Sequence, residues 1–256
     1  LPGLAAWGRV RDWRVGQLHK LPQVEIFRES RMDAGAVLEA GCSLVALATG
    51  SAWRRDGLGR SHHRPLSGLD KIRVYTPDDI MAGARPEGPV VIFDDDHYYM
   101  GGVIAELLRR AGSAVTLVTP ESLVSAFTVN TLEQTAIQRR LMELEVTLMT
   151  SKTLVSLDRD NVGLSCVFTQ RIERIAAGSV VLVTMQSPED TLYHELAARP
   201  DDLRRAGVRK LVRIGDCLAP GTIAAAVYAG HRFARDLGVT SDAVPFRREN
   251  VELAEM

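Results

Sequence analysis

The sequence predicts an α/β fold built on parallel sheets, and three observations point to it. Continuous apolar runs alternate with stretches of helical spacing along the 256 residues, as in α/β proteins. The runs lack a polar/apolar alternation, which is typical of strands covered on both faces. The composition, 46% hydrophobic and 25% charged, suits a globular protein of one or two domains.

The elements follow from this periodicity in chain order. We expect helices at 4–20, from Pro77, from the turn after 90–93 to Ala111, and at 131–145, 191–206 and 222–237. We expect strands at 24–27, 43–49, 90–93 and 114–119, three within 146–168, and two more at 179–185 and 210–214. A polar loop is expected at 51–70 and a break at 83–89, where glycine and proline gather.

The turn after the strand at 90–93 has an unusual composition. A strand, a tight turn and a helix normally hold a pyrophosphate on glycine N–H groups, but here Asp94, Asp95, Asp96, His97 and Tyr98 fill the turn. The acids and the histidine could bind a hard divalent cation. Adjacent residues in a tight turn rarely converge on one ion, so we favour capping of the following helix and expect no metal.

Charge and cysteine content exclude several functions. The formal net charge of −1 gives no general attraction for nucleic acid or a membrane, and no apolar stretch is long enough to span a bilayer. Three scattered cysteines make no disulfide framework or metal motif, which predicts a reducing cytoplasm. His62, His63 and His231 lack partners at ligand spacing, and no nucleophile–base pair is evident, so no catalytic residue is assigned. The chain does not begin with methionine, and we expect a piece of a longer protein.

Several motifs carry a resemblance to a known family. "LPGLAAWGRVRDW", "ALATGSAWRRDG", "DDDHYYMGG", "IGDCLAPGTIAAAV" and "VPFRRE" resemble the C-terminal nucleotide-binding region of the trimethylamine, dimethylamine and histamine dehydrogenases. These are iron–sulfur flavoproteins related to the NADH:flavin oxidoreductases of old yellow enzyme type. The resemblance implies an upstream barrel carrying FMN, then a 4Fe-4S cluster, and then a region that holds ADP, or FAD, rather than NAD(P).

The resemblance also implies a fold and a domain organisation. It predicts two Rossmann-like three-layer units of the FAD/NAD(P)-binding type, the second inserted in the first. Residues 1–86 and 188–256 would form a partial FAD/ADP-binding domain truncated at its N-terminus, because its glycine-rich turn would lie before Leu1. Residues 87–187 would form the inserted domain of NAD-binding type.

The candidate binding residues lie at two strand ends of the first domain. By resemblance, Thr49 and Gly50 line the adenine-nucleotide cleft, with Trp53 as a wall or a packing residue. Gly215 and Asp216 lie near the pyrophosphate. Gly221 and Thr222 open a helix whose free N–H groups suit a phosphate.

The inserted domain carries a degenerate dinucleotide turn. The three glycine positions of the motif fall at Asp96, Tyr98 and Gly101, of which only Gly101 survives. A carboxylate at ~4 Å from a phosphate charge costs about 4 kcal/mol at an effective dielectric constant near 20. Thr119 stands where an acid would bind the ribose, and Met185 replaces a cleft glycine. We therefore expect no NAD(P) at this turn.

The expected function is that of a non-catalytic region of an amine dehydrogenase. It would bind ADP and brace the barrel and cluster domains of the parent chain, a homodimer that passes electrons to an electron-transferring flavoprotein. One alternative is the nucleotide region of an NAD(P)H-dependent ene- or dienoyl-reductase, which needs a working second turn. The other is a non-catalytic interaction module.

Overall fold

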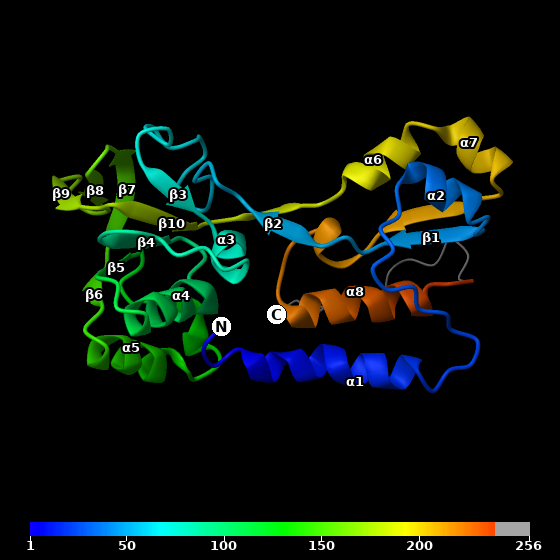
Figure 1. Ribbon diagram of the computed structural model, residues 1–256, viewed down its shortest axis with the longest axis horizontal. Coiled ribbons are helices and arrows are strands. Elements are labelled where there is room, and N and C mark those ends of the chain that lie inside the picture. Colours follow the sequence, from blue (N-terminus) through cyan, green and yellow to red (C-terminus); the bar gives the residue numbers. More distant parts are fainter. Residues whose placement is uncertain (239–256) are drawn as a thin grey trace, which may run out of the picture. The chain divides into compact units, whose positions relative to one another are not determined.

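The computed structural model describes residues 1–238 of the chain (Figure 1). It divides into two compact units, which are described separately. Unit 1 holds 1–31 and 51–187, and unit 2 holds 32–50 and the chain from Pro188 onward. The motif "VPFRRE" lies outside the described residues. The domain boundaries expected at 86/87 and 187/188 stay a prediction.

Unit 1 is organised around a five-stranded parallel sheet. Its strand order is β3-β10-β4-β5-β6. The strands are β3 (Arg73–Tyr75), β4 (Val90–Asp94), β5 (Val115–Val118), β6 (Thr147–Met149) and β10 (Ser179–Val183). Every residue of β4 and β10 is buried, as their continuous Val, Ile, Leu and Phe runs predict for central parallel strands.

Three helices cover one face of this sheet. They are α3 (Pro77–Met81), α4 (Tyr99–Arg110) and α5 (Gln134–Glu143). The apolar positions of α4 recur at helical spacing, so that one side of the helix packs on the strands. The buried cluster between helices and sheet includes Ile80, Ile92, Ile104, Leu108, Leu117, Leu141 and Val183.

An antiparallel sheet covers the opposite face. It consists of β7 (Lys152–Leu157), β8 (Asn161–Cys166) and β9 (Ile172–Ala176), in that order. Its apolar side chains meet those of the parallel sheet in a second buried cluster, which includes Leu66, Val91, Phe93, Leu154, Leu157, Val162, Leu164, Val180 and Leu182. The β7–β8 register shifts between Leu154 and Ser156, which makes a bulge at Val155.

The remaining elements of unit 1 lie outside these layers. The chain returns to unit 1 at β2 (Ser51–Trp53) and leaves it at β11 (Gln186–Pro188), and these two strands pair as a two-stranded sheet. The short helix η2 (Ala126–Val129) precedes α5. At the start of the chain, η1 (Ala5–Trp7) and α1 (Gly8–Leu18) bury none of their residues.

Unit 2 has a smaller sheet. Strands β1 (Leu44–Leu47) and β12 (Lys210–Arg213) pair in parallel. The helical elements are α2 (Ala34–Glu39), α6 (Thr191–Ala197), α7 (Pro200–Arg205), η3 (Gly215–Cys217) and α8 (Ile223–Arg235). The core is formed by Ala34, Val37, Leu47, Leu196 and Cys217. None of the residues of α8 is buried.

The structure corrects the expected fold class. A doubly wound Rossmann sheet carries helices on both faces, whereas the sheet of unit 1 carries helices on one face and an antiparallel sheet on the other. In unit 2, the described residues form a sheet of only two strands. The alternation of strands and helices established parallel pairing, but it could not say what covers the second face. The expectation of two Rossmann-like units is therefore wrong.

Several local expectations also differ from the structure. Residues 24–27 form no strand, and the expected helix at 191–206 is two helices, of which the second begins at Pro200. Proline is favoured at the first helical position, which explains the break. The elements α2, β3 and β9 were not expected. Within residues 1–238, no helix combines the length and apolar character needed to cross a membrane.

Candidate functional site

The acidic turn between β4 and α4 is a buried feature of unit 1. Asp94 and Asp95 have no exposed surface, and His97 is 3% exposed. The backbone of His97 has a φ of +65°, a left-handed conformation that is costly for a residue with a side chain. The surrounding contacts therefore hold this turn in a strained conformation.

Three successive backbone N–H groups of the turn are already bonded inside the unit. Those of Asp95 and Asp96 both donate to the carbonyl oxygen of Val183, at 2.9 and 3.1 Å. That of His97 donates to Oδ1 of Asp94 at 3.0 Å. In a phosphate-binding turn such N–H groups point at the ligand. Here a phosphate would have to displace internal hydrogen bonds.

Asp95 is the centre of a polar network. Its carboxylate accepts hydrogen bonds from the backbone N–H and the hydroxyl of Ser61, at 2.8 and 2.6 Å. Nε2 of His97 lies 3.6 Å from Oδ1 of Asp95, and Nδ1 of His97 lies 3.3 Å from Oγ1 of Thr119. The aspartate, histidine and threonine are all buried. This arrangement fixes the turn and presents no exposed nucleophile.

Burial changes the proton affinities of the turn. It raises the pKa of Asp94 to about 7. The hydrogen bond from the His97 N–H lowers this pKa, and the negative charge of Asp96 raises it further. Oδ2 of Asp94 has no hydrogen-bond partner among the described residues. Burial also raises the pKa of Asp96, although the positive charge of Arg60 lowers it in part. The same burial lowers the pKa of His97.

Two tyrosines stand at the start of α4. Tyr98 precedes the helix, and its ring meets that of Tyr99 edge-on with centroids 4.3 Å apart. The hydroxyl of Tyr99 donates to Thr131 at 3.1 Å and to Glu133. No side chain caps the helix, and its first turn holds no acid, so the expected capping by the aspartates is wrong.

Metal chemistry finds no support in the geometry. The described part of the chain contains no group of three or more His, Cys, Asp or Glu side chains placed to hold an ion. In the acidic turn, the carboxylate of Asp95 is directed at Ser61 and Oδ1 of Asp94 at the backbone of His97. The aspartates therefore do not converge.

In unit 2, the structure brings four of the predicted residues to one sheet edge. Thr49 and Gly50 follow β1, while Gly215 and Asp216 follow β12, the neighbouring parallel strand. The hydroxyl of Thr49 donates to the carbonyl oxygen of Glu189. Gly50 has a φ of +82°, and a Cβ added to it would meet nothing within 4 Å. A ligand can therefore approach the backbone closely at Gly50.

The helix that follows this edge is locally capped. The side chain of Thr222 accepts the N–H of Ala225 at 3.4 Å, and Oδ1 of Asp216 accepts the N–H of Gly221 at 3.3 Å. Asp216 therefore acts on the backbone, and Gly221 belongs to the loop that leads into α8. These bonds are long, and they leave the loop only weakly fixed.

Trp53 belongs to unit 1. Its backbone N–H donates to Oδ2 of Asp78 at 2.7 Å, and its ring packs against the core under the helices.

The role of Ser61 was missed by sequence reasoning. Ser61 lies 34 residues before Asp95, and no local pattern in the polar loop could have indicated that contact.

Comparisons with known proteins place the chain. Residues 75–190 match the family described as the old yellow enzyme (OYE)-like second alpha/beta domain. Dimethylamine dehydrogenase of Hyphomicrobium sp. (strain x) is 32% identical over 97% of this chain, which spans 38% of that protein.

Two solved structures extend this similarity. Histamine dehydrogenase from Rhizobium sp. 4-9 is 44% identical, with a TM-score of 0.95, over 100% of this chain and 40% of its own. 6-Hydroxypseudooxynicotine amine oxidase from Pseudomonas geniculata N1 is 41% identical, with a TM-score of 0.89, over 93% of this chain and 35% of its own.

These matches confirm the resemblance and correct the fold class a second time. The matching family is the second α/β domain of OYE-like proteins, not a Rossmann-type FAD- or NAD(P)-binding family. The chain spans about two fifths of the length of the relatives it matches. Within that span, the chain belongs with the dimethylamine and histamine dehydrogenases as their homologue.

Proposed function

We propose that the protein containing this chain is an amine dehydrogenase-type oxidoreductase that oxidises a small amine. The observation that carries the proposal is the 44% identity to histamine dehydrogenase across the whole chain, together with 32% identity to dimethylamine dehydrogenase. The two relatives are named for different amines, dimethylamine and histamine, so the proposed substrate is given only as a small amine.

The chemistry itself is proposed to lie outside these residues. Asp94, Asp95 and His97 are buried, and the two carboxyl groups accept hydrogen bonds from within the unit, which suits a structural role. FMN and a 4Fe-4S cluster are proposed for the rest of the protein, by family resemblance. The present chain then braces those parts in a homodimeric enzyme.

We further propose that ADP binds as a structural ligand at the sheet edge of unit 2. Thr49, Gly50, Gly215 and Asp216 lie at the carboxyl ends of two parallel strands, where ligands of α/β sheets bind. Support comes from the open space beside Gly50 and from the loop at Gly221 and Thr222 leading into α8. The nearest arginine along the chain, Arg213, is ion-paired with Asp190, so backbone N–H groups would have to carry most of the phosphate binding.

The proposed electron acceptor is an electron-transferring flavoprotein rather than NAD(P). Hydride transfer to NAD requires a nicotinamide held against the flavin, and hence an anchored pyrophosphate. The internally bonded N–H groups of Asp95, Asp96 and His97 support this choice. The ene- or dienoyl-reductase alternative requires the opposite arrangement at this turn.

The test uses the full-length enzyme. Amine oxidation is assayed with a one-electron dye, with an electron-transferring flavoprotein, and with NAD or NADP as acceptor, and the bound nucleotide is released and identified. We expect turnover with the first two acceptors and ADP as the released nucleotide. Amine-dependent NADH formation would refute the proposed acceptor, and release of FAD or of no nucleotide would refute the ADP site.

A further inference from the structure

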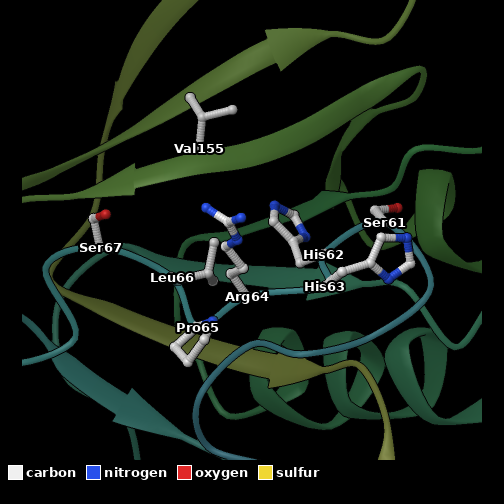
Figure 2. Close-up of a pocket in the computed structure, with 8 residues that line it drawn as sticks. All are labelled: Ser61, His62, His63, Arg64, Pro65, Leu66, Ser67 and Val155. Atoms are coloured by element: carbon white, nitrogen blue, oxygen red, sulfur yellow. The ribbon is translucent and has the colours of Figure 1, made fainter.

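A second polar feature of unit 1 lies between the loop 61–67 and the bulge of β7. It is a pocket of about 370 Å³ (Figure 2). The lining residues are Ser61, His62, His63, Arg64, Pro65, Leu66, Ser67 and Val155. The set contains an arginine and two histidines but no carboxylate, so the lining favours an anion.

Arg64 differs from the other arginines nearby. Arg54 is paired with Asp56, and Arg55 with Asp79, whereas Arg64 makes no ion pair or hydrogen bond within residues 1–238. Figure 2 shows its guanidinium group beside the imidazole of His62, both on the side of the loop that faces Val155. A guanidinium presents parallel N–H donors that match the oxygens of a phosphate.

His62 is held in one orientation. Its Nε2 lies 2.6 Å from the carbonyl oxygen of Leu154, and its ring meets Phe93 edge-on with centroids 5.5 Å apart. A carbonyl oxygen can only accept, so Nε2 carries the proton and Nδ1 of the neutral ring is an acceptor. Nδ1 is buried and has no hydrogen-bond partner among the described residues.

The β7 bulge contributes to this arrangement. The register shift leaves Val155 without a partner on β8, and the residue before it supplies the carbonyl that orients His62. Bulges commonly redirect a strand next to a binding site. The polar loop and the sheet that covers unit 1 thus form the pocket together.

We propose that this pocket binds a phosphate group, with Arg64 as its main contact and the ring of His62 in its wall. The guanidinium N–H groups match the oxygens of a phosphate, and a phosphate dianion is attracted to this charge more strongly than the single charge of a carboxylate. Nδ1 of His62 is buried and makes no contact with the phosphate. The site is distinct from the sheet edge of unit 2 and shares only Ser61 with the network of the acidic turn.

Inorganic phosphate is the probe, added to the full chain at pH 7.5 and constant ionic strength with chloride as the balancing anion. We expect a saturable rise in melting temperature and a change in the ¹⁵N NMR signals of the His62 ring. Arg64→Gln should raise the phosphate concentration needed for half-saturation at least tenfold. Arg85→Gln is the matched control, because Arg85 is exposed and bonds only the neighbouring carbonyl of Ala84.

Acetate at the same concentration forms the second arm and is expected to produce smaller changes, because it carries a single charge and phosphate at this pH carries nearly two. Equal responses to acetate and phosphate would overturn the assignment of a phosphate site. Phosphate binding that is unchanged in Arg64→Gln, or an absence of saturable binding in a folded wild-type chain, would overturn the pocket itself. The circular dichroism spectrum of each variant verifies that the fold is retained.

Discussion

The carboxyl group of Asp94 fills the space beside Gly101. A Cβ added to Gly101 would lie 2.5 Å from Cγ and 2.6 Å from Oδ2 of Asp94, well inside van der Waals contact. Asp94 ends β4 and Gly101 lies in the first turn of α4. The strand and the helix approach closely at this point because one residue has no side chain and the other is short.

Gly101→Ala is therefore expected to destabilise the protein. Asp94 is fully buried, and its short side chain has no open space to move into, so the added methyl group must push the helix away from the strand. Overpacking of this kind costs about 1–3 kcal/mol. Urea unfolding followed by circular dichroism measures the change in the free energy of unfolding.

Gly230→Ala is the matched control for that substitution. Gly230 lies inside α8, and a Cβ added to it would meet nothing within 4 Å. Alanine has a higher helix propensity than glycine, so this variant is expected to be more stable than the wild type, with a free energy of unfolding higher by about 0.5–1 kcal/mol. If Gly101→Ala behaves like the control, the close contact with Asp94 is not a constraint. The double variant Asp94→Ala, Gly101→Ala should be less destabilised than the sum of the single variants.

The raised pKa of Asp94 predicts a pH dependence of stability. The folded state holds the proton up to a pKa of about 7, whereas the unfolded chain releases it near the usual 3.8. Between these values the folded state binds more protons, so this contribution to stability is complete below pH 3.8 and falls as the pH rises to 7. From pH 5 to pH 8 the loss is about 3 kcal/mol.

Asp94→Asn isolates this effect. The asparagine is neutral at every pH, and its side-chain oxygen can still accept the N–H of His97. The stability of the wild type minus that of the variant should therefore decrease from pH 5 to pH 8. Urea unfolding of both proteins at five pH values measures it, and the subtraction cancels the opposing contribution of His97, whose pKa is lowered. A difference that stays constant with pH would show that Asp94 does not titrate in this range.

Asp95 supports a different prediction. Asp95→Ala removes the acceptor for both donors of Ser61 and leaves the His97 ring without its carboxylate neighbour. Ser61 is exposed, so water can replace part of its bonds, whereas the buried ring of His97 loses a polar neighbour that water cannot replace. A loss of about 1–3 kcal/mol is therefore expected in thermal unfolding. Asp12→Ala is the control. Asp12 pairs only with its exposed neighbour Arg11, and such a pair contributes about 0–1 kcal/mol. Equal effects of the two substitutions would contradict the role of Asp95.

The residues that could and could not be predicted differ in the range of their contacts. The buried strands β4 and β10 follow from their continuous apolar sequences, and α4 from its periodicity, since both signals are local. The contact between Ser61 and Asp95, and the antiparallel sheet over the parallel one, join segments far apart in the chain. The motifs indicated the relatives, but the composition of the turn at Asp94 could not indicate which layer covers the sheet. The expected Rossmann class failed for that reason.

The last prediction concerns NADH. The N–H groups of Asp95 and Asp96 are bonded to Val183, and that of His97 to Asp94, so these three donors of the acidic turn are not available to a pyrophosphate. Calorimetric titration of the chain with NADH should show no binding tighter than millimolar.

The double variant Asp96→Gly, Tyr98→Gly places glycine at the two positions where a dinucleotide motif would have it, and it is expected to bind NADH no better than the wild type. The substitutions remove one charge and one ring, but Asp94 and Asp95 stay buried in the turn and the same N–H groups stay bonded to Val183 and Asp94. Matching circular dichroism spectra and melting temperatures of the two proteins are the control for folding. Micromolar NADH binding by the wild type that these substitutions abolish would show that the turn holds the dinucleotide. Micromolar binding gained by the variant would show that charge and bulk, rather than the internal hydrogen bonds, had closed the site.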